Sequence, residues 1–180
     1  MQVQSRTKKI IKSGTILILA IIVIIGISAG LGAIGFPFWP FSLFLFFYTA
    51  VDKSDPHKLK GTAISGAIGI AAGMSQGIVT QTTGNPTLGV LALALCVLVL
   101  GTAFIMGDVS WAKVFGLLLL NMITLFPQDP CVWAGVPDKS SMGWLESFAR
   151  VMGSYLIVVF LFVGINAVVK RKKAVSQFTD

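Results

Sequence analysis

The stretch Gly61–Thr80, GTAISGAIGIAAGMSQGIVT, decides the fold of this chain. It contains no charged residue, and Ser65, Gly69, Gly73 and Gly77 recur at every fourth position. In water each glycine costs about 1 kcal/mol relative to alanine inside a helix, so the stretch is a poor soluble helix. In lipid the backbone must satisfy its own hydrogen bonds, and a stripe of small residues lets another helix approach closely. The stretch therefore predicts a transmembrane helix with a smooth packing face.

The composition of the whole chain is that of a membrane protein. Its 180 residues are 55% hydrophobic and only 12% charged, with a mean hydropathy of +0.86, whereas soluble domains carry about 25% charged residues. We expect an all-α fold, a polytopic helix bundle forming a single membrane domain over 1–180, surrounded by lipid in the bacterial inner membrane. Cys96 and Cys131 fall in an apolar run and in a loop, and they predict neither a disulfide framework nor a metal site.

Basic residues predict which side of the membrane each connection lies on. The net charge of +7 comes from clusters beside apolar segments, chiefly Arg6–Lys12, Lys53–Lys60 and Lys170–Lys173. Such clusters mark cytoplasmic flanks, so both termini are expected inside and nucleic acid is not expected as a partner. Of the fourteen Lys and Arg residues, all but Lys139 and Arg150 lie in segments expected on the cytoplasmic side.

Apolar runs separated by turn residues predict six transmembrane helices. Segment 37–51 is shorter than the roughly 20 residues of a full span, so it is a short span or a re-entrant half-helix; the basic loop after it favours a hairpin of two spans. Asn85 is a good N-cap, and Pro86 fits the first position of the following helix. The expected spans are 14–35, 37–51, 61–80, 87–106, 111–126 and 144–169, with a basic cytoplasmic tail over 170–180.

Charged residues that could carry catalysis or proton coupling are absent from the middle of every expected span. Intramembrane carboxylates and imidazoles carry protons in coupled transporters, and the chain has no nucleophile, zinc or phosphate-loop motif. We therefore expect no enzyme activity, no cofactor and no metal. Glu146 and Arg150 lie one helical turn apart near the outer end of the last span. They predict either an ion pair that makes both charges tolerable or a polar gate at an outer vestibule.

Uncharged polar residues within the spans are the other candidates for a site. Gln76 and Asn121 carry the amides that are costliest to leave unpaired, and Asn85 lies in a turn that could flank a binding site. These groups predict either interhelical hydrogen bonds, worth ~0.6 kcal/mol on average in membranes, or the lining of a path for a small polar solute. The candidates for substrate or pore contacts are Gln76, Asn85, Asn121, Thr124, Glu146 and Arg150.

The glycine stripe needs a helix to pack against it, and the first span carries a matching pair of small residues. Gly26 and Gly30 are four positions apart in that span, the spacing that allows close helix contact in membranes. We therefore expect the first span to be the partner of the stripe. The candidates for helix packing are Gly26, Gly30, Ser65, Gly69, Gly73 and Gly77.

Three features between Gly26 and Val79 carry a resemblance to a known family: GISAGLGAIG over 26–35, Trp39 with the Phe-rich segment that ends at Tyr48, and KLKGTAIS over 58–65 followed by the helix that contains Gly73. In these features the chain resembles the small bacterial inner-membrane proteins grouped as domain of unknown function ten ninety-seven. The resemblance implies an inner-membrane location, and it implies no activity and no site residues. Length and six spans also resemble the substrate-binding subunits of energy-coupling-factor vitamin importers.

Three functions fit these observations. The first is a passive channel or facilitator for a small polar solute, acting as a homo-oligomer because six short helices are few for an enclosed pore. The second is a substrate-binding membrane subunit of a multi-component importer, with segment 61–80 as the helix that docks on an energising partner. The third is a non-transporting scaffold or regulator whose basic tail and 52–60 loop bind another protein.

Overall fold

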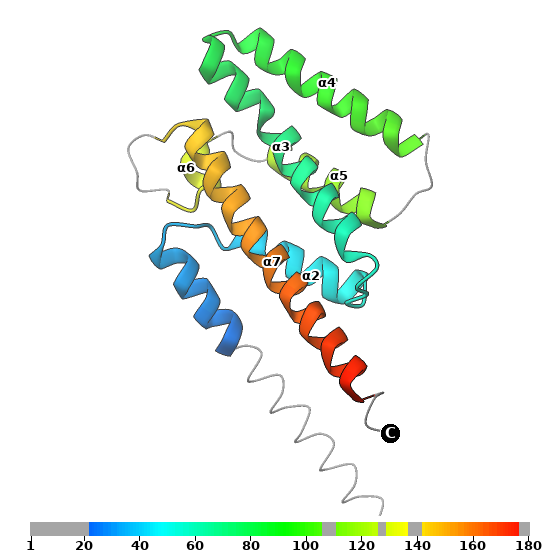
Figure 1. Ribbon diagram of the computed structural model, residues 1–180. Helices are drawn as coiled ribbons and strands as arrows, with labels where there is room; N and C mark the ends of the chain where they lie inside the picture. Colours follow the sequence, from blue (N-terminus) through cyan, green and yellow to red (C-terminus); the bar gives the residue numbers. More distant parts are fainter. Residues whose placement is uncertain (1–21, 106–110, 126–128, 137–141, 177–180) are drawn as a thin grey trace, which may run out of the picture.

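The computed structural model describes residues 22–105, 111–125, 129–136 and 142–176, and every regular element over these residues is a helix. The all-helical class predicted from the sequence is confirmed for this part of the chain. Figure 1 shows two long helices, α3 and α7, running antiparallel and side by side. The elements in order are a first helix over Ile22–Ala33, α2 (Trp39–Phe46) continuing as the π-helix η1 (Phe47–Val51), α3 (Leu59–Thr83), α4 (Pro86–Ile105), α5 (Trp111–Leu125), α6 (Pro130–Trp133) and α7 (Trp144–Ser176).

Each predicted span has a helix at its place in the described residues, although residues 14–21 of the first span and the predicted ends at 106 and 126 lie outside them. Two of the described helical segments, Leu59–Thr83 and Trp144–Val168, are long and apolar enough to cross a membrane by themselves. The other apolar segments have 10–17 residues and are shorter than the roughly 20 residues of a full span. These shorter segments are Ile22–Ala33, Trp39–Val51, Pro86–Thr102 and Lys113–Leu125.

Local polar contacts and a positive φ angle explain how α3 ends and how α4 begins. Gly84 adopts a left-handed conformation with φ of +66°, which a glycine at a helix C-terminus reaches without strain. The next residue is Asn85, whose Oδ1 accepts a hydrogen bond from the Thr87 backbone N–H at 2.9 Å. Asn85 therefore caps α4, and Pro86 occupies the first helical position.

The short helix α6 interrupts the long loop after α5, where the sequence predicted no helix. The Asp129 Oδ1 accepts a hydrogen bond from the Cys131 N–H at 2.8 Å, and Pro130 follows Asp129 at the first helical position. An aspartate before a proline is an ordinary helix start. The signal was present in the sequence, but a helix of one turn leaves no periodic apolar pattern to support it.

The small-residue stripe of α3 packs against α5 and against the start of α7. The Ser65 hydroxyl oxygen accepts a hydrogen bond from the Gly116 N–H at 3.1 Å, and a Cβ on Gly69 would overlap the Gly116 carbonyl. One turn further on, a Cβ on Gly73 would lie 2.8 Å from the Cβ of Ile123. These glycines thus let the backbones of α3 and α5 approach closely.

The expectation that the first span is the partner of this stripe is wrong for the described residues. Gly26 and Gly30 are exposed, and a Cβ on either would meet nothing within 4 Å. The first helix reaches the core through Leu31, which is 4% exposed. The physical reason is that the second small residue needed for close approach is Gly116, which stands alone among the large residues of α5.

Aromatic rings fill the centre of the bundle. Phe44 of α2 is completely buried, and its ring centroid lies 5.4 Å from that of Tyr155 and 6.1 Å from that of Phe115. The rings of Tyr48 and Phe162 pack on the same cluster, with centroids 4.9 Å apart. Side chains from α2, η1, α5 and α7 therefore meet in one closely packed aromatic core.

Candidate functional site

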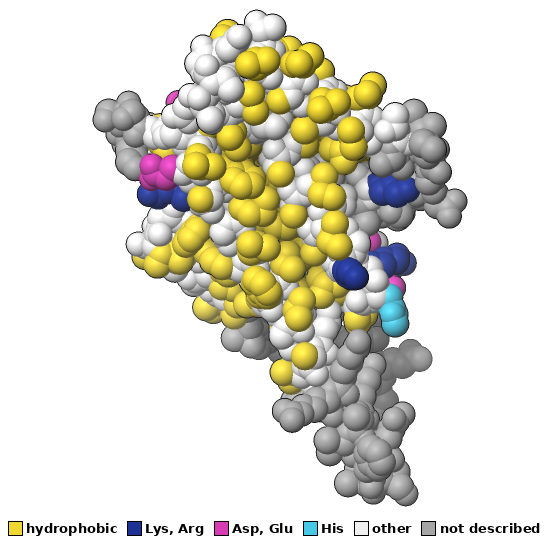
Figure 2. Space-filling view, turned by 45° about the horizontal axis from the view of Figure 1, so that its top comes forward, with side chains coloured by type: hydrophobic (Ala, Val, Ile, Leu, Met, Phe, Trp, Pro, Cys, Tyr) yellow, Lys and Arg dark blue, Asp and Glu magenta, His cyan; other side chains and the backbone are white. Residues whose placement is uncertain are grey.

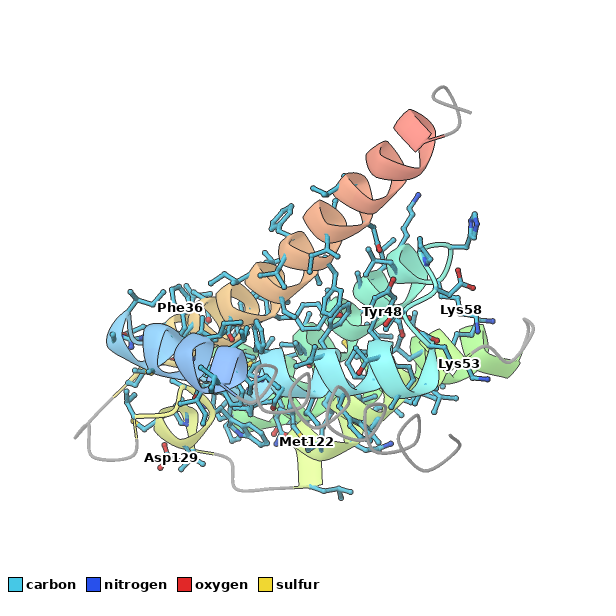
Figure 3. All side chains as sticks on the ribbon, turned by 90° about the horizontal axis from the view of Figure 1, so that it is seen from below. Phe36, Tyr48, Lys53, Lys58, Met122 and Asp129 are labelled. Carbon is cyan, nitrogen blue, oxygen red and sulfur yellow. The ribbon has the colours of Figure 1, made fainter. Side chains whose placement is uncertain are left out.

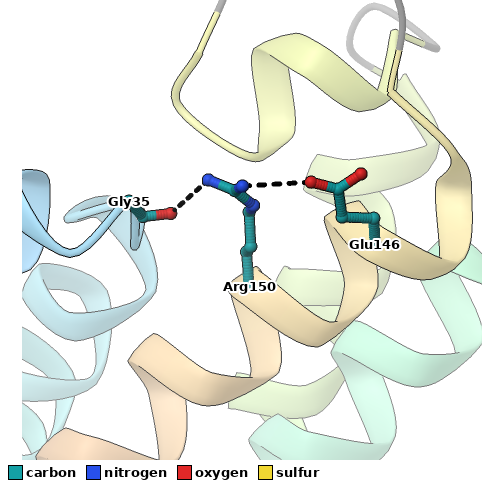
Figure 4. A network of polar contacts seen from close by, with 3 residues as sticks. All are labelled: Gly35, Glu146 and Arg150. Carbon is teal, nitrogen blue, oxygen red and sulfur yellow. Dashed lines mark hydrogen bonds and ion pairs between the residues drawn. The ribbon is translucent and has the colours of Figure 1, made fainter.

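One polar corner lies where the first helix ends beside the start of α7 (Figure 4). The Arg150 Nη1 donates a hydrogen bond to the Gly35 carbonyl at 2.9 Å, and its Nη2 lies 3.0 Å from the Glu146 Oε1. Gly35 has φ of +74°, and a cation beside the last carbonyls of a helix stabilises its C-terminus. The hydrogen bond to Gly35 therefore joins the end of the first helix to α7, and the ion pair within α7 holds the guanidinium group beside that carbonyl.

Further contacts tie the same corner to α2, α3 and α6. The Ser154 hydroxyl donates to the Pro37 carbonyl at 2.5 Å. The Trp39 Nε1 donates to the Trp133 carbonyl at 2.9 Å, and the two indole rings pack edge to face with centroids 5.4 Å apart. The Gln81 side-chain oxygen, at the end of α3, accepts a hydrogen bond from the backbone of Trp144 at 2.6 Å. These contacts thus join five elements at this corner, namely the first helix, α2, α3, α6 and α7.

A second polar cluster lies at the opposite end of the bundle, around a buried carboxylate. Asp52 is 2% exposed, and its Oδ2 accepts a hydrogen bond from the Thr62 hydroxyl at 2.5 Å. The Tyr155 hydroxyl donates to the Ala63 carbonyl at 2.9 Å and is within 3.2 Å of the Thr62 carbonyl. The Asp52–Thr62 contact holds the turn after η1 against α3, and the Tyr155 hydroxyl holds α7 against the same part of α3.

The backbone around this carboxylate is unusual. Asp52 follows the π-helix η1, and the next residues, Lys53 and Ser54, have positive φ angles of 53° and 56°. The Ser54 N–H donates to the Tyr48 carbonyl at 2.9 Å, and the Tyr48 hydroxyl oxygen accepts a hydrogen bond from the Asn166 amide at 3.2 Å. Figure 3 shows Tyr48 and Lys53 toward the same end of α2. Because π-turns and strained residues often occur at functional sites, this cluster is a candidate that the sequence did not reveal.

No sequence pattern indicates this cluster, because Asp52 opens the charged stretch DKSDPHKLK, which is typical of a solvated loop. The tight turn after η1 places the Asp52 carboxylate against Thr62 of α3. Groups of three or more His, Cys, Asp or Glu that could hold a metal do not occur among the described residues.

The predicted polar residues are spread over several elements. Gln76 is half-buried on α3, where its backbone lies beside Gly89 of α4. Asn121 is exposed on α5, and the Thr124 hydroxyl donates to the Leu120 carbonyl of the same helix at 3.0 Å. Of the six predicted site residues, the described hydrogen bonds join the side chains of Glu146 and Arg150, and the Thr124 hydroxyl donates to the Asn121 backbone carbonyl at 3.2 Å. Asn85 serves as a helix cap.

The exposed face of α5 places an amide among leucines. Leu118 is 49% exposed and Leu125 is 80% exposed, and the exposed Asn121 lies between them on the same side of the helix. An amide has two N–H donors and a carbonyl acceptor. The Asn121 amide can therefore form hydrogen bonds on an otherwise apolar stripe, in contrast to the phenylalanine rings of the core behind it.

Helices α3 and α4 are close together at their turn and separate further along, as Figure 1 shows. At the turn, a Cβ on Gly89 would lie 2.6 Å from the Gln76 carbonyl oxygen. Two to three turns further along α4, an open groove of ≈ 340 Å³ separates the two helices. The groove is lined by Ile68, Ala71, Ala72, Leu95, Cys96, Val99 and Leu100.

Apolar side chains dominate one face of the molecule, and charged side chains lie at its edges (Figure 2). Acidic and basic side chains lie together at one edge, and basic side chains lie with His57, the single histidine of the sequence, at the other. Large apolar residues are widely exposed among the described residues, including Leu91 at 65%, Leu98 at 64% and Phe160 at 68%. The face in Figure 2 therefore has an apolar band between two charged rims.

Comparison with known proteins finds no family model, no curated protein and no solved structure that matches this chain. The resemblance over Gly26–Val79 therefore stays an expectation from the sequence.

Proposed function

We propose that this chain is a multi-pass integral membrane protein that acts as a homo-oligomer and provides a path for a small polar solute between its copies. The apolar band between the charged rims supports the membrane location. Soluble monomers rarely expose contiguous apolar patches of more than a few hundred Å², because burying apolar surface is the main driving force of folding. In a bilayer the same side chains contact lipid tails at no such cost.

The order of the turns supports six crossings with both termini on the cytoplasmic side. In Figure 1 the 52–58 turn and the C-terminal end of α7 lie toward the lower right, whereas the 84–85 turn and α6 lie toward the upper left. The lower-right end carries Lys53, Lys58 and Lys60, so the positive-inside rule assigns it to the cytoplasm. The short helices then require tilting of the protein or local thinning of the bilayer.

The position of the Asn121 amide carries the proposal of a path between copies. Aromatic rings occupy the protomer centre, so they favour a path at the protein surface over one through the core. Asn121 lies on the exposed leucine stripe of α5. An amide that faces lipid tails loses its hydrogen bonds with water, whereas between copies of α5 it can bond to a partner amide or to a passing solute.

Solute flux into proteoliposomes tests this function. We expect the purified protein to raise glycerol or urea permeability above that of empty liposomes. Asn121→Leu should lower the flux to the level of empty liposomes, because the change removes the only polar group that we assign to the path. Gln76→Leu is the matched control: it also replaces an amide with leucine, but on α3, and should leave the flux unchanged. Flux no higher than in empty liposomes would overturn the path and favour the scaffold alternative.

The importer-subunit alternative is less well supported by the packing of α3. In that alternative the small-residue face of α3 docks on an energising partner. Ser65 and Gly69 instead contact Gly116 of α5 within the same chain, and a Cβ on Gly77 would overlap the ring of Trp144. A stable complex with a cytoplasmic ATPase module on co-purification would revive this alternative.

A further inference from the structure

The groove between α3 and α4 is an opening on the face that we assign to lipid. The two helices contact each other closely at Gly89 and diverge toward Leu100, and α4 packs chiefly against α3. Along α4 the exposed Leu91 and Leu98 are seven residues apart, so they lie together on one face of the helix, outside the residues that line the groove. An opening without partner atoms forfeits dispersion contacts along its walls, so a fitting occupant would stabilise this arrangement.

The chemistry of the groove selects a hydrocarbon occupant. Its walls consist of Ile, Leu, Val and Ala side chains and one cysteine, Cys96. The groove extends over at least one helical turn of α3, from Ile68 to Ala72, and of α4, from Leu95 to Leu100. One turn of an α-helix, about 10–12 Å across with its side chains and 5.4 Å long, takes up about 400 Å³ or more, which exceeds the ≈ 340 Å³ of the groove. A single extended chain of methylenes fits this volume and these walls.

An exposed track on α3 connects the groove to a positive charge. Lys60, Ile64, Ile68 and Ala71 are all exposed and recur every three or four residues, so they lie on one face of the helix. Lys60 is two turns from Ile68, about 12 Å along the axis at 1.5 Å per residue. A ligand with an anionic group at Lys60 would therefore lay its apolar chain over Ile64 and into the groove. Basic residues near the membrane surface attract anionic lipid head groups.

We propose that the α3–α4 groove binds one acyl chain of an anionic phospholipid whose phosphate lies at Lys60. The inference rests on the proposed membrane location, and it is independent of the proposed solute path. The ligand would cover the diverging part of the hairpin and hold α4 against the bundle.

Photo-crosslinking of the full chain in lipid nanodiscs tests the proposal. The probe is phosphatidylglycerol with a photoactivatable group near the end of one acyl chain, and mass spectrometry locates the adducts. We expect adducts concentrated on the residues that line the groove, Ile68, Ala71 and Ala72 of α3 and Leu95, Cys96, Val99 and Leu100 of α4. Ala71→Phe should lower them about tenfold, the loss expected when two methylenes are displaced from the groove. Ala94→Phe is the matched control, since Ala94 is also exposed but does not line the groove.

The head-group part of the proposal has its own comparison. A phosphatidylcholine probe of the same chain length should label the groove more weakly than phosphatidylglycerol, and Lys60→Gln should abolish that preference. Equal labelling of the wild-type groove by both probes would overturn the role of Lys60.

Other outcomes distinguish a failure of the lipid site from a failure of the membrane location or of the solute path. Adducts as dense on Leu91 and Leu98 as in the groove, or unchanged adducts in Ala71→Phe, would overturn the binding site. Release of the chain from membranes by an alkaline wash would overturn the membrane location and the groove together. Groove labelling that persists in a preparation without solute flux supports the lipid site and overturns only the path.

Discussion

At the scale of single residues, Asp52 differs most from its expected environment. Its sequence context, between Val51 and a run of charges, is that of an exposed loop, yet its carboxylate is buried under α3 with the Thr62 hydroxyl as a donor. Burial of a carboxylate is costly without compensating hydrogen bonds. The Asp52–Thr62 contact is therefore expected to matter for stability whether or not the cluster has a further role.

Removal of the Thr62 hydroxyl tests this contact. Thr62→Val keeps the shape of the side chain but leaves the Asp52 carboxylate without that donor, so we expect a loss of about 1–3 kcal/mol in the free energy of unfolding. Thr82→Val is the control on the same helix, because the exposed Thr82 hydroxyl bonds only to its own helix at the Ile78 carbonyl. Unfolding in detergent, followed by circular dichroism, measures both. Equal stability of the two variants would show that the buried contact contributes nothing.

At the scale of elements, the positions of the longer helices could be predicted, whereas the short helix α6 and the packing partners of the helices could not. Apolar runs and turn residues such as Asn85–Pro86 are local signals, and they predicted the start of α4 to within one residue. The predicted end at 106 lies outside the described residues. Pairing depends on which small residues meet in space. Gly26 and Gly30 matched the stripe by spacing, but Gly116, a lone glycine without a motif, is the residue that Ser65 and Gly69 contact.

The same glycine-to-alanine substitution at Gly69 and at Gly30 compares how much each position contributes to helix packing. Gly69→Ala should destabilise the protein by about 1–3 kcal/mol, since its Cβ would overlap the Gly116 backbone and force α3 and α5 apart. Gly30→Ala should be neutral or stabilising by up to about 1 kcal/mol, because alanine favours the helix and its Cβ meets open space. Thermal unfolding in detergent measures the difference. A larger loss of stability in Gly30→Ala than in Gly69→Ala would place the close helix contact at Gly30 instead.

At the scale of the whole molecule, composition predicted the all-helical class because so apolar a chain must satisfy its backbone within helices. It could not predict the candidate sites. The polar groups expected to line one pore lie on separate faces, and the groove arises from the divergence of α3 and α4, which no local pattern encodes. At the polar corner, Arg150 forms an i,i+4 pair with Glu146, which the sequence indicated. Its contact with Gly35, 115 residues away, was not indicated by the sequence.

The central claim is a membrane bundle with its Lys53–Lys60 end in the cytoplasm, and cysteine accessibility in intact cells tests it most directly. Thr83→Cys and Lys58→Cys each add an exposed thiol at opposite ends of α3, whereas the native Cys96 and Cys131 are half-buried and buried, so the wild-type chain gives the background. A membrane-impermeant maleimide should label Thr83→Cys in intact cells, and should label Lys58→Cys only after the cells are permeabilised. Labelling of Lys58→Cys in intact cells, or recovery of the chain in the soluble fraction, would contradict the account.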